Sequence, residues 1–168
     1  MNVDGNKNKK SNTIALLDTD DMPSDLIKNV IYKWNGYQEN LDFYSVPAYL
    51  ETNSSRLKAK YINFINSLGD IRVNKKTIND HLSLKNGYNL WWMSLVTEKS
   101  PFKSSKVFDC LRLLALEEII ISQDIKKLIL HSNSKILAEA VKILCSNLAI
   151  SFSWHRTKLK KKIKKINT

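Results

Sequence analysis

The chain has 168 residues and a formal net charge of +11 at pH 7. That length is typical of one ordinary domain, which buries about 70% of the surface that its unfolded chain exposes. No run of 18 apolar residues occurs, so the sequence predicts no transmembrane helix.

The positive charge is concentrated at the two ends of the chain. Without the ten basic residues of segments 1–10 and 156–168, and without Asp4, residues 11–155 carry 17 basic and 15 acidic side chains. The leader 1–12 is polar and lacks the apolar centre of a secretory signal, so we expect it to be disordered and the protein to be cytoplasmic. Cys110 and Cys145 lack metal or redox spacing and are predicted to be buried thiols.

Two strands are expected near the start. Residues 13–17 (TIALL) form an apolar run that ends at the acidic segment 18–21, as a buried strand followed by a polar loop does. Residues 30–34 (VIYKW) end at Asn35-Gly36, which is a strong turn signal.

Helical patterns occupy the middle of the chain. Apolar residues recur at three-, four- and seven-residue steps between Pro47 and Leu68, which predicts one amphipathic helix with Gly69 as the left-handed residue after its end. Residues 75–84 (KKTINDHLSL) predict a shorter helix. Ser104 or Ser105 can cap a further helix, whose body 107–121 is apolar nearly all round and must be buried on most sides.

The last part of the sequence has the clearest architecture. A strand at 127–130, an amphipathic helix at 134–147 and a strand at 150–154 predict a crossover unit with parallel strands. We therefore expect an α/β, Rossmann-like three-layer domain over residues 13–155 with a mainly parallel sheet, followed by a basic tail at 156–168.

The segment 90–104 (LWWMSLVTEKSPFKS) carries the first candidate site. Adjacent side chains point in different directions, so at most one of Trp91 and Trp92 can stack on a ligand while the other packs inward. The alternative is that both tryptophans pack in a core or at a domain interface.

Charged and hydroxyl residues follow the two tryptophans. Glu98 could act as a general base, and Lys99 and Lys103 could hold an anion. Lys103 and Ser104 also precede the start of a helix, where free N–H groups attract anions. A solvated surface pair is the simpler alternative for Glu98 and Lys99.

His131 and Ser132 form the second candidate site, because they lie at the carboxyl end of a strand just before a helix. Ligands of open α/β sheets bind at that edge. A plain connection with Ser132 or Ser134 as helix cap is the alternative. No histidine or cysteine has ligand spacing, so we expect no metal site.

The tail admits two interpretations. Its apolar residues have helical spacing, which would give a basic amphipathic helix suited to an anionic membrane surface. The alternative is a solvated terminus. No aromatic residues are interleaved with the lysines of the tail, so we expect no nucleic-acid binding.

Three segments carry a family resemblance: 45–57 (SVPAYLETNSSRL), 90–104 (LWWMSLVTEKSPFKS) and 113–117 (LLALE). In order and spacing they resemble the bacterial surface carbohydrate biosynthesis family associated with lipopolysaccharide O-antigen loci. The likeness runs from about Thr13 to Trp154. Members of that family look like glycosyltransferases with two Rossmann-like halves and are several times longer than this chain.

The resemblance implies that this chain corresponds to the N-terminal half of such a transferase and carries at most its acceptor side. A nucleotide sugar donor would then bind the C-terminal half, and this chain would need no cofactor of its own. The implied partners are a saccharide or lipid-linked acceptor and a missing C-terminal domain or partner chain, at the cytoplasmic face of the inner membrane. The rival hypothesis is a non-catalytic module that docks a partner domain and uses its basic tail at the membrane.

Overall fold

The computed structural model describes residues 12–19, 30–37, 43–94, 97, 104 and 106–156. These residues belong to two compact units. The first contains the described residues up to Ser45 and those from Gln123 onward, and the second runs from Val46 to Ser122. The span 13–155, expected as one Rossmann-like domain, thus includes both units, and the main sheet belongs to the first.

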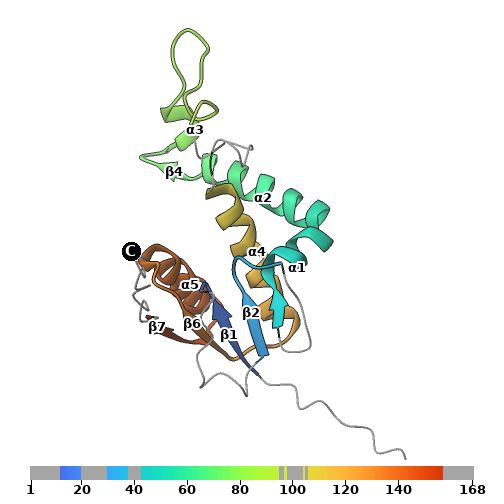
Figure 1. The fold of residues 1–168 in the computed structure, drawn as a ribbon. Coiled ribbons are helices and arrows are strands. Elements are labelled where there is room, and N and C mark those ends of the chain that lie inside the picture. Colours follow the sequence, from blue (N-terminus) through green and yellow to red (C-terminus); the bar gives the residue numbers. More distant parts are fainter. Residues whose placement is uncertain are drawn as a thin grey trace, which may run out of the picture. The chain divides into compact units, whose positions relative to one another are not determined.

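A five-stranded sheet forms most of the first unit (Figure 1). Its strands are β1 (Thr13–Leu17), β2 (Val30–Lys33), β3 (Phe43–Ser45), β6 (Lys127–His131) and β7 (Ser151–His155). The order across the sheet is β3-β2-β1-β6-β7, and every neighbouring pair is parallel. This is the strand order of a Rossmann-like α/β fold, so the predicted fold class is confirmed.

The predicted strands lie within one residue of the observed ones, and β3 is an additional strand that the sequence did not predict. The central strand β1 is the most deeply buried, with no exposed surface at Ile14, Ala15 or Leu16. Leu128 and Leu130 of β6 are equally buried. A parallel strand that is covered on both faces needs such a continuous apolar run.

The crossover between the last two strands is the helix α5 (Lys135–Asn147). Ser134 caps this helix by accepting a hydrogen bond from the Leu137 N–H at 3.2 Å. The apolar side of α5 is buried, and the helix packs beside β7. Burial raises the pKa of the Cys145 thiol on this side to about 11, so the thiol stays protonated at neutral pH.

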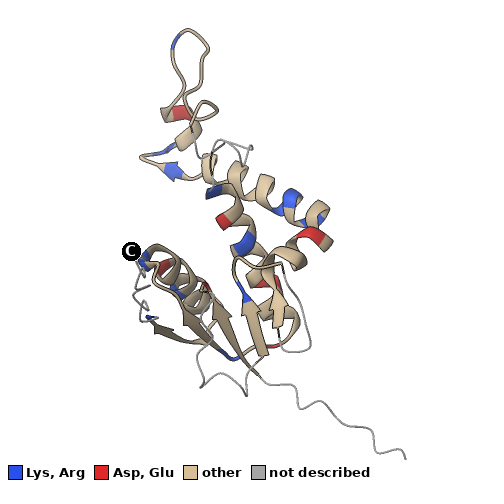
Figure 2. Ribbon diagram, viewed as in Figure 1, with Lys and Arg blue, Asp and Glu red and all other residues tan. Residues whose placement is uncertain are grey.

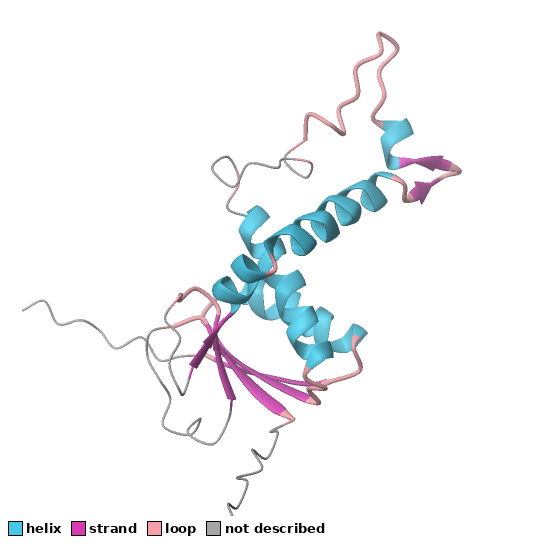
Figure 3. Cartoon of the chain, turned by 90° about the vertical axis from the view of Figure 1, so that its right-hand side faces the viewer, coloured by secondary structure: helices cyan, strands magenta, loops and turns pink. Residues whose placement is uncertain are grey.

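The second unit is mainly helical. Its elements are α1 (Val46–Thr52), α2 (Ser54–Gly69), the hairpin strands β4 (Arg72–Val73) and β5 (Lys76–Thr77), α3 (Ile78–His81) and α4 (Lys106–Ser122). In Figure 3 the hairpin and α3 follow directly after the end of α2. No helix of the described ranges is long and apolar enough to cross a bilayer.

Ion pairs join α2 to α4, both of which carry charged residues in Figure 2. Arg56 lies 2.7 Å from Glu118, and Lys60 lies 2.6 Å from Glu117. The helix predicted at 107–121 is confirmed, since α4 covers these residues. Its predicted burial on most sides holds only in part, because Phe108 and Ile121 are exposed by 41% and 61%. The ion pairs align the two helices, but each contributes little stability because the basic partners are partly exposed.

The helix predicted from Pro47 to Leu68 is in fact two helices, α1 and α2. They meet at Asn53, whose φ of −109° and ψ of 20° are not helical. Its side-chain amide donates to the Tyr49 carbonyl at 2.9 Å, a local contact that competes with the helical pattern. The apolar spacing continues across this break, which explains why it predicted one helix.

The helix predicted over 75–84 is also wrong. Asn74 and Lys75 have positive φ angles of 50° and 70° and form the turn between β4 and β5. Only Ile78–His81 is helical. Thr77 and Asp80 begin that helix with a capping box, in which the Thr77 hydroxyl accepts from the Asp80 N–H and the Asp80 carboxylate accepts from the Thr77 N–H.

Gly69 is not the left-handed residue expected after a helix. It is the last residue of α2, and its backbone angle is not in the positive region. Its missing side chain instead leaves room for an indole: a Cβ placed there would lie 3.0 Å from Trp91 Nε1 and 3.1 Å from Cε2. Trp91 is buried in a cluster with Tyr61, Ile65 and Val107.

We predict that Gly69→Ala destabilises the second unit by about 1 kcal/mol. The added methyl group would overpack the indole, at about 1–3 kcal/mol, and this outweighs the gain of up to about 1 kcal/mol in helix propensity. Urea unfolding followed by circular dichroism measures the difference. In a Trp91→Phe background the smaller ring should remove most of the penalty, and an equal penalty in both backgrounds would contradict the packing argument.

Candidate ligand site at the carboxyl edge of the sheet

The parallel strands end on one edge, and their last residues form a single row. Strand register aligns Ser45, Lys33, Leu17, His131 and His155 across β3, β2, β1, β6 and β7. The chain runs from β1 outward to β2 on one side and from β6 outward to β7 on the other. The strand order therefore reverses between β1 and β6, which is where open α/β sheets bind ligands.

Asp18, the first residue after β1, connects the ends of three strands. Its Oδ1 atom accepts a hydrogen bond from the Asn35 side-chain amide at 2.7 Å, and its Oδ2 atom accepts one from the Ser132 hydroxyl at 2.6 Å. Asn35 follows β2, and Ser132 follows β6. One carboxylate thus lies at the position where the strand order reverses and is held from both sides.

Ser132 connects this carboxylate to the start of α5. It has no exposed surface, and its hydroxyl also accepts a hydrogen bond from the Ser134 N–H at 3.0 Å. Its carbonyl accepts from the Trp154 indole N–H at 2.8 Å. Ser132 therefore positions Asp18, the helix start and β7 together, and Ser134 rather than Ser132 is the helix cap.

A pocket of about 430 Å³ lies between the ends of β1 and β2. Leu17, Asp18, Thr19, Lys33, Asn35, Gly36 and Tyr37 line it. The Lys33 stem packs against Gly36, where a Cβ would lie 3.0 Å from Lys33 Cδ. The Lys33 ammonium lies 4.9 Å from the centre of the Phe43 ring, in cation–π range. The residues that line the pocket thus supply the Asp18 carboxylate, the Asn35 amide, the Thr19 hydroxyl and the Tyr37 ring.

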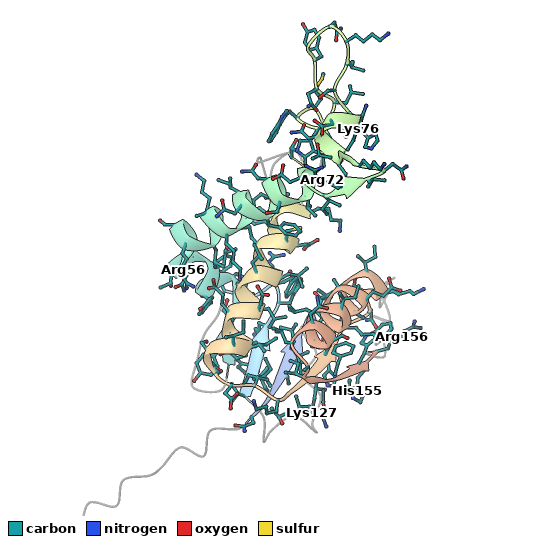
Figure 4. The ribbon with its side chains drawn as sticks, turned by 180° about the vertical axis from the view of Figure 1, so that it is seen from behind. Arg56, Arg72, Lys76, Lys127, His155 and Arg156 are labelled. Carbon is teal, nitrogen blue, oxygen red and sulfur yellow. The ribbon has the colours of Figure 1, made fainter. Side chains whose placement is uncertain are left out.

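The other half of the edge carries aromatic and basic groups. The rings of His131 and His155 stack with their centres 5.0 Å apart and an angle of 13° between their planes. Arg156, labelled beside His155 in Figure 4, lies with its guanidinium 4.9 Å from the centre of the Trp154 ring. His131 is buried at 4% exposure, so His155 and Arg156 are the groups that solvent or a ligand reaches here.

The two tryptophans of the first candidate site have opposite environments. Trp91 is 5% exposed, whereas Trp92 is 52% exposed and meets it edge to face with ring centres 6.5 Å apart. The Trp91 carbonyl accepts from the hydroxyls of Ser94 and Thr97 at 2.8 Å and 3.1 Å. Trp91 is therefore a core residue of the second unit, and Trp92 is the member of the pair that a ligand can reach.

The remaining residues of that candidate site are described only in part. Glu98, Lys99 and Lys103 lie outside the described residues. Ser104 is half-buried, and its carbonyl accepts from the Val107 N–H at 3.2 Å in the first turn of α4. The convergence of these residues with a tryptophan on one surface stays a prediction.

Sequence reasoning did not single out Asp18 and Asn35, although both appear in the signals that ended the predicted strands. A polar residue directly after a buried strand could have identified them, as it did His131 and Ser132. Among the described residues, no group of three or more His, Cys, Asp or Glu could hold a metal ion.

Comparison of the chain with protein-family models, with curated proteins and with solved structures found no match.

We predict that Trp91→Ala lowers the free energy of unfolding by about 3–5 kcal/mol, because it empties a large buried site. Trp92→Ala should cost only about 0.5–1.5 kcal/mol, because this ring is half-exposed and loses mainly its edge-to-face contact with Trp91. Urea titrations of the two variants, measured side by side, make each the control for the other. Equal losses would contradict the assignment of Trp91 to the core and Trp92 to the surface.

We predict that Ser132→Ala costs about 1–3 kcal/mol, because it removes a fully buried hydroxyl and leaves the Ser134 N–H without its acceptor and a carboxylate without one of its donors. Ser146→Ala, at an exposed position of α5, is the matched control and should be neutral within about 0.5 kcal/mol. Thermal unfolding by calorimetry distinguishes the two. A neutral Ser132→Ala would mean that the hydroxyl does not support the edge.

Proposed function

We propose that this chain is the N-terminal domain, or a truncated member, of a surface polysaccharide (lipopolysaccharide O-antigen) biosynthesis protein of the glycosyltransferase type. The observation that carries the proposal is the parallel sheet in the order β3-β2-β1-β6-β7, with a polar network and a pocket where the strand order reverses. The family resemblance of segments 45–57, 90–104 and 113–117 supplies the biological context.

In this proposal the chain binds the acceptor. The acceptor is a saccharide or a lipid-linked saccharide, and the nucleotide sugar donor belongs to a C-terminal half or partner chain. Glu98 is the proposed base, and Lys99 and Lys103 are proposed anion contacts. The chain alone does not transfer sugar, and it acts in the cytoplasm at the inner membrane, with its basic tail on the anionic lipid surface.

We predict that the purified chain binds oligosaccharides released from O-antigen and does not turn over UDP-N-acetylglucosamine. Isothermal titration calorimetry measures the first and a UDP-release assay the second. Glu98→Ala and Lys99→Ala should each weaken saccharide binding about tenfold, equivalent to about 1.4 kcal/mol.

Matched controls are Lys135→Ala and Glu139→Ala, which alter an exposed pair on α5 with 74% and 61% of its side-chain surfaces accessible. These variants should bind normally. Binding of the nucleotide sugar without binding of any saccharide would overturn the acceptor role.

A second function is favoured by one specific observation. Between residues 84 and 93 of the second unit, five large apolar side chains are exposed by 43–71%: Leu84, Tyr88, Leu90, Trp92 and Met93. Exposed apolar groups of this kind are typical of surfaces that meet a partner. A non-catalytic docking module would need these side chains, so Tyr88→Ser together with Met93→Ser would abolish the association of the chain with the partner half.

A further inference from the structure

We infer that the pocket at the ends of β1 and β2 binds the vicinal diol of an uncharged sugar ring through the Asp18 carboxylate. The assignment deepens the proposed function, on which the choice of a saccharide rests. It moves the recognition of the sugar from the tryptophan segment of the second unit to the sheet edge of the first.

The Asp18 carboxylate has acceptor capacity left for a ligand. A carboxylate offers about four lone-pair positions. Asn35 and Ser132 each donate to a different oxygen of Asp18, which uses two of them. Each oxygen therefore keeps a free lone-pair position, and two neighbouring hydroxyl groups of a sugar ring can donate to these two positions. Hydrogen bonds to a charged acceptor are about twice as strong as neutral ones.

The carboxylate is also fixed before any ligand arrives. Ser132 is fully buried and hydrogen-bonded to the Ser134 N–H, so the hydroxyl that orients Asp18 cannot rotate freely. On the other side, the Asn35 side-chain amide after β2 donates to Asp18 Oδ1 at 2.7 Å. A group that is already oriented loses little conformational freedom on binding, which favours affinity for a small ligand.

The charge of the site favours a neutral ligand over a phosphate. The start of α5 would ordinarily attract an anion, but the N–H of the cap residue Ser134 and the N–H of Leu137 in the first turn already bond to the hydroxyls of Ser132 and Ser134. The Asp18 carboxylate lies beside them and repels a phosphate. Lys33 is the only basic side chain among the described residues that line the pocket, and its ammonium lies over the Phe43 ring.

The pocket has the size and lining that a sugar ring requires. Its volume of about 430 Å³ falls in the range of small-molecule sites. Tyr37 is 65% exposed and offers an aromatic face for the apolar side of a sugar ring. Thr19 and Asn35 add a hydroxyl and an amide, both of which can donate and accept.

The test is a titration of the full chain, labelled with ¹⁵N, followed by two-dimensional NMR. The probes are methyl hexopyranosides, uridine and inorganic phosphate, each added separately. We expect the glycosides to shift the amide signals of Asp18, Asn35 and Ser132, and we expect phosphate not to do so. Uridine carries a ribose diol without any phosphate, so it separates a nucleoside from a saccharide as the source of the diol.

Variants locate the binding. Asp18→Asn should weaken glycoside binding at least tenfold, whereas Asp124→Asn, which changes a 71% exposed carboxylate at the opposite end of β6, should leave it unchanged. Tyr37→Ala alters an exposed side chain that the fold does not need, and it should weaken binding several-fold. This second variant keeps the test decisive if Asp18→Asn fails to fold.

The outcomes separate this inference from the proposed function. Glycoside binding that Asp18→Asn and Tyr37→Ala leave unchanged overturns the inference and leaves the acceptor role standing, as does binding that shifts only the amides of 84–94. Shifts at the edge by uridine alone support the diol site and count against the acceptor role. The inference is overturned if phosphate alone shifts the amide signals of Asp18, Asn35 and Ser132, or if no probe shifts them.

Discussion

The structure of the first unit depends on one hydrogen-bonded carboxylate at the point where its strand order reverses. Strands β1, β2 and β6 are apolar in their interiors and end in the same register row, so the polar groups that follow them have no further strand to pair with. The Asp18 carboxylate supplies the acceptor for two of these groups, at 2.7 Å from the Asn35 amide and 2.6 Å from the Ser132 hydroxyl. Since Ser132 also bonds to the N–H of Ser134, the cap residue of α5, the carboxylate aligns the strand ends and the crossover helix together.

Most of the sheet could be predicted from the sequence because its central strands are short apolar runs that end at turn signals or polar residues. The run 13–17 is an example, since burial on both faces demands it. β3 escaped prediction because three residues give no periodicity to detect. The break at Asn53 and the turn at Asn74 and Lys75 depend on backbone angles that most residues avoid, and no apolar spacing encodes such angles.

The candidate site was predictable only in part. His131 and Ser132 follow from a local rule, since they lie between a strand and a helix. Their connection to Asp18 does not, because the two partners of that hydrogen bond are 114 residues apart and meet only when β1 pairs with β6. Likewise the spacing of Trp91 and Trp92 indicated that one points inward, but the choice of Trp91 depends on the space that Gly69 leaves against its indole.

The evidence for function divides between the two units. Apart from Ser45, the segments that resemble the surface carbohydrate family fall in the second unit, whereas the polar edge and its pocket belong to the first. A sheet edge of this kind arises from strand order and would bind a ligand in many α/β proteins, so it argues for binding but not for one reaction. The tryptophan segment argues for the family but, with Trp91 in a core, offers a ligand only Trp92. Because the two arguments rest on different residues, a saccharide that requires Asp18 would support the acceptor role without relying on the resemblance.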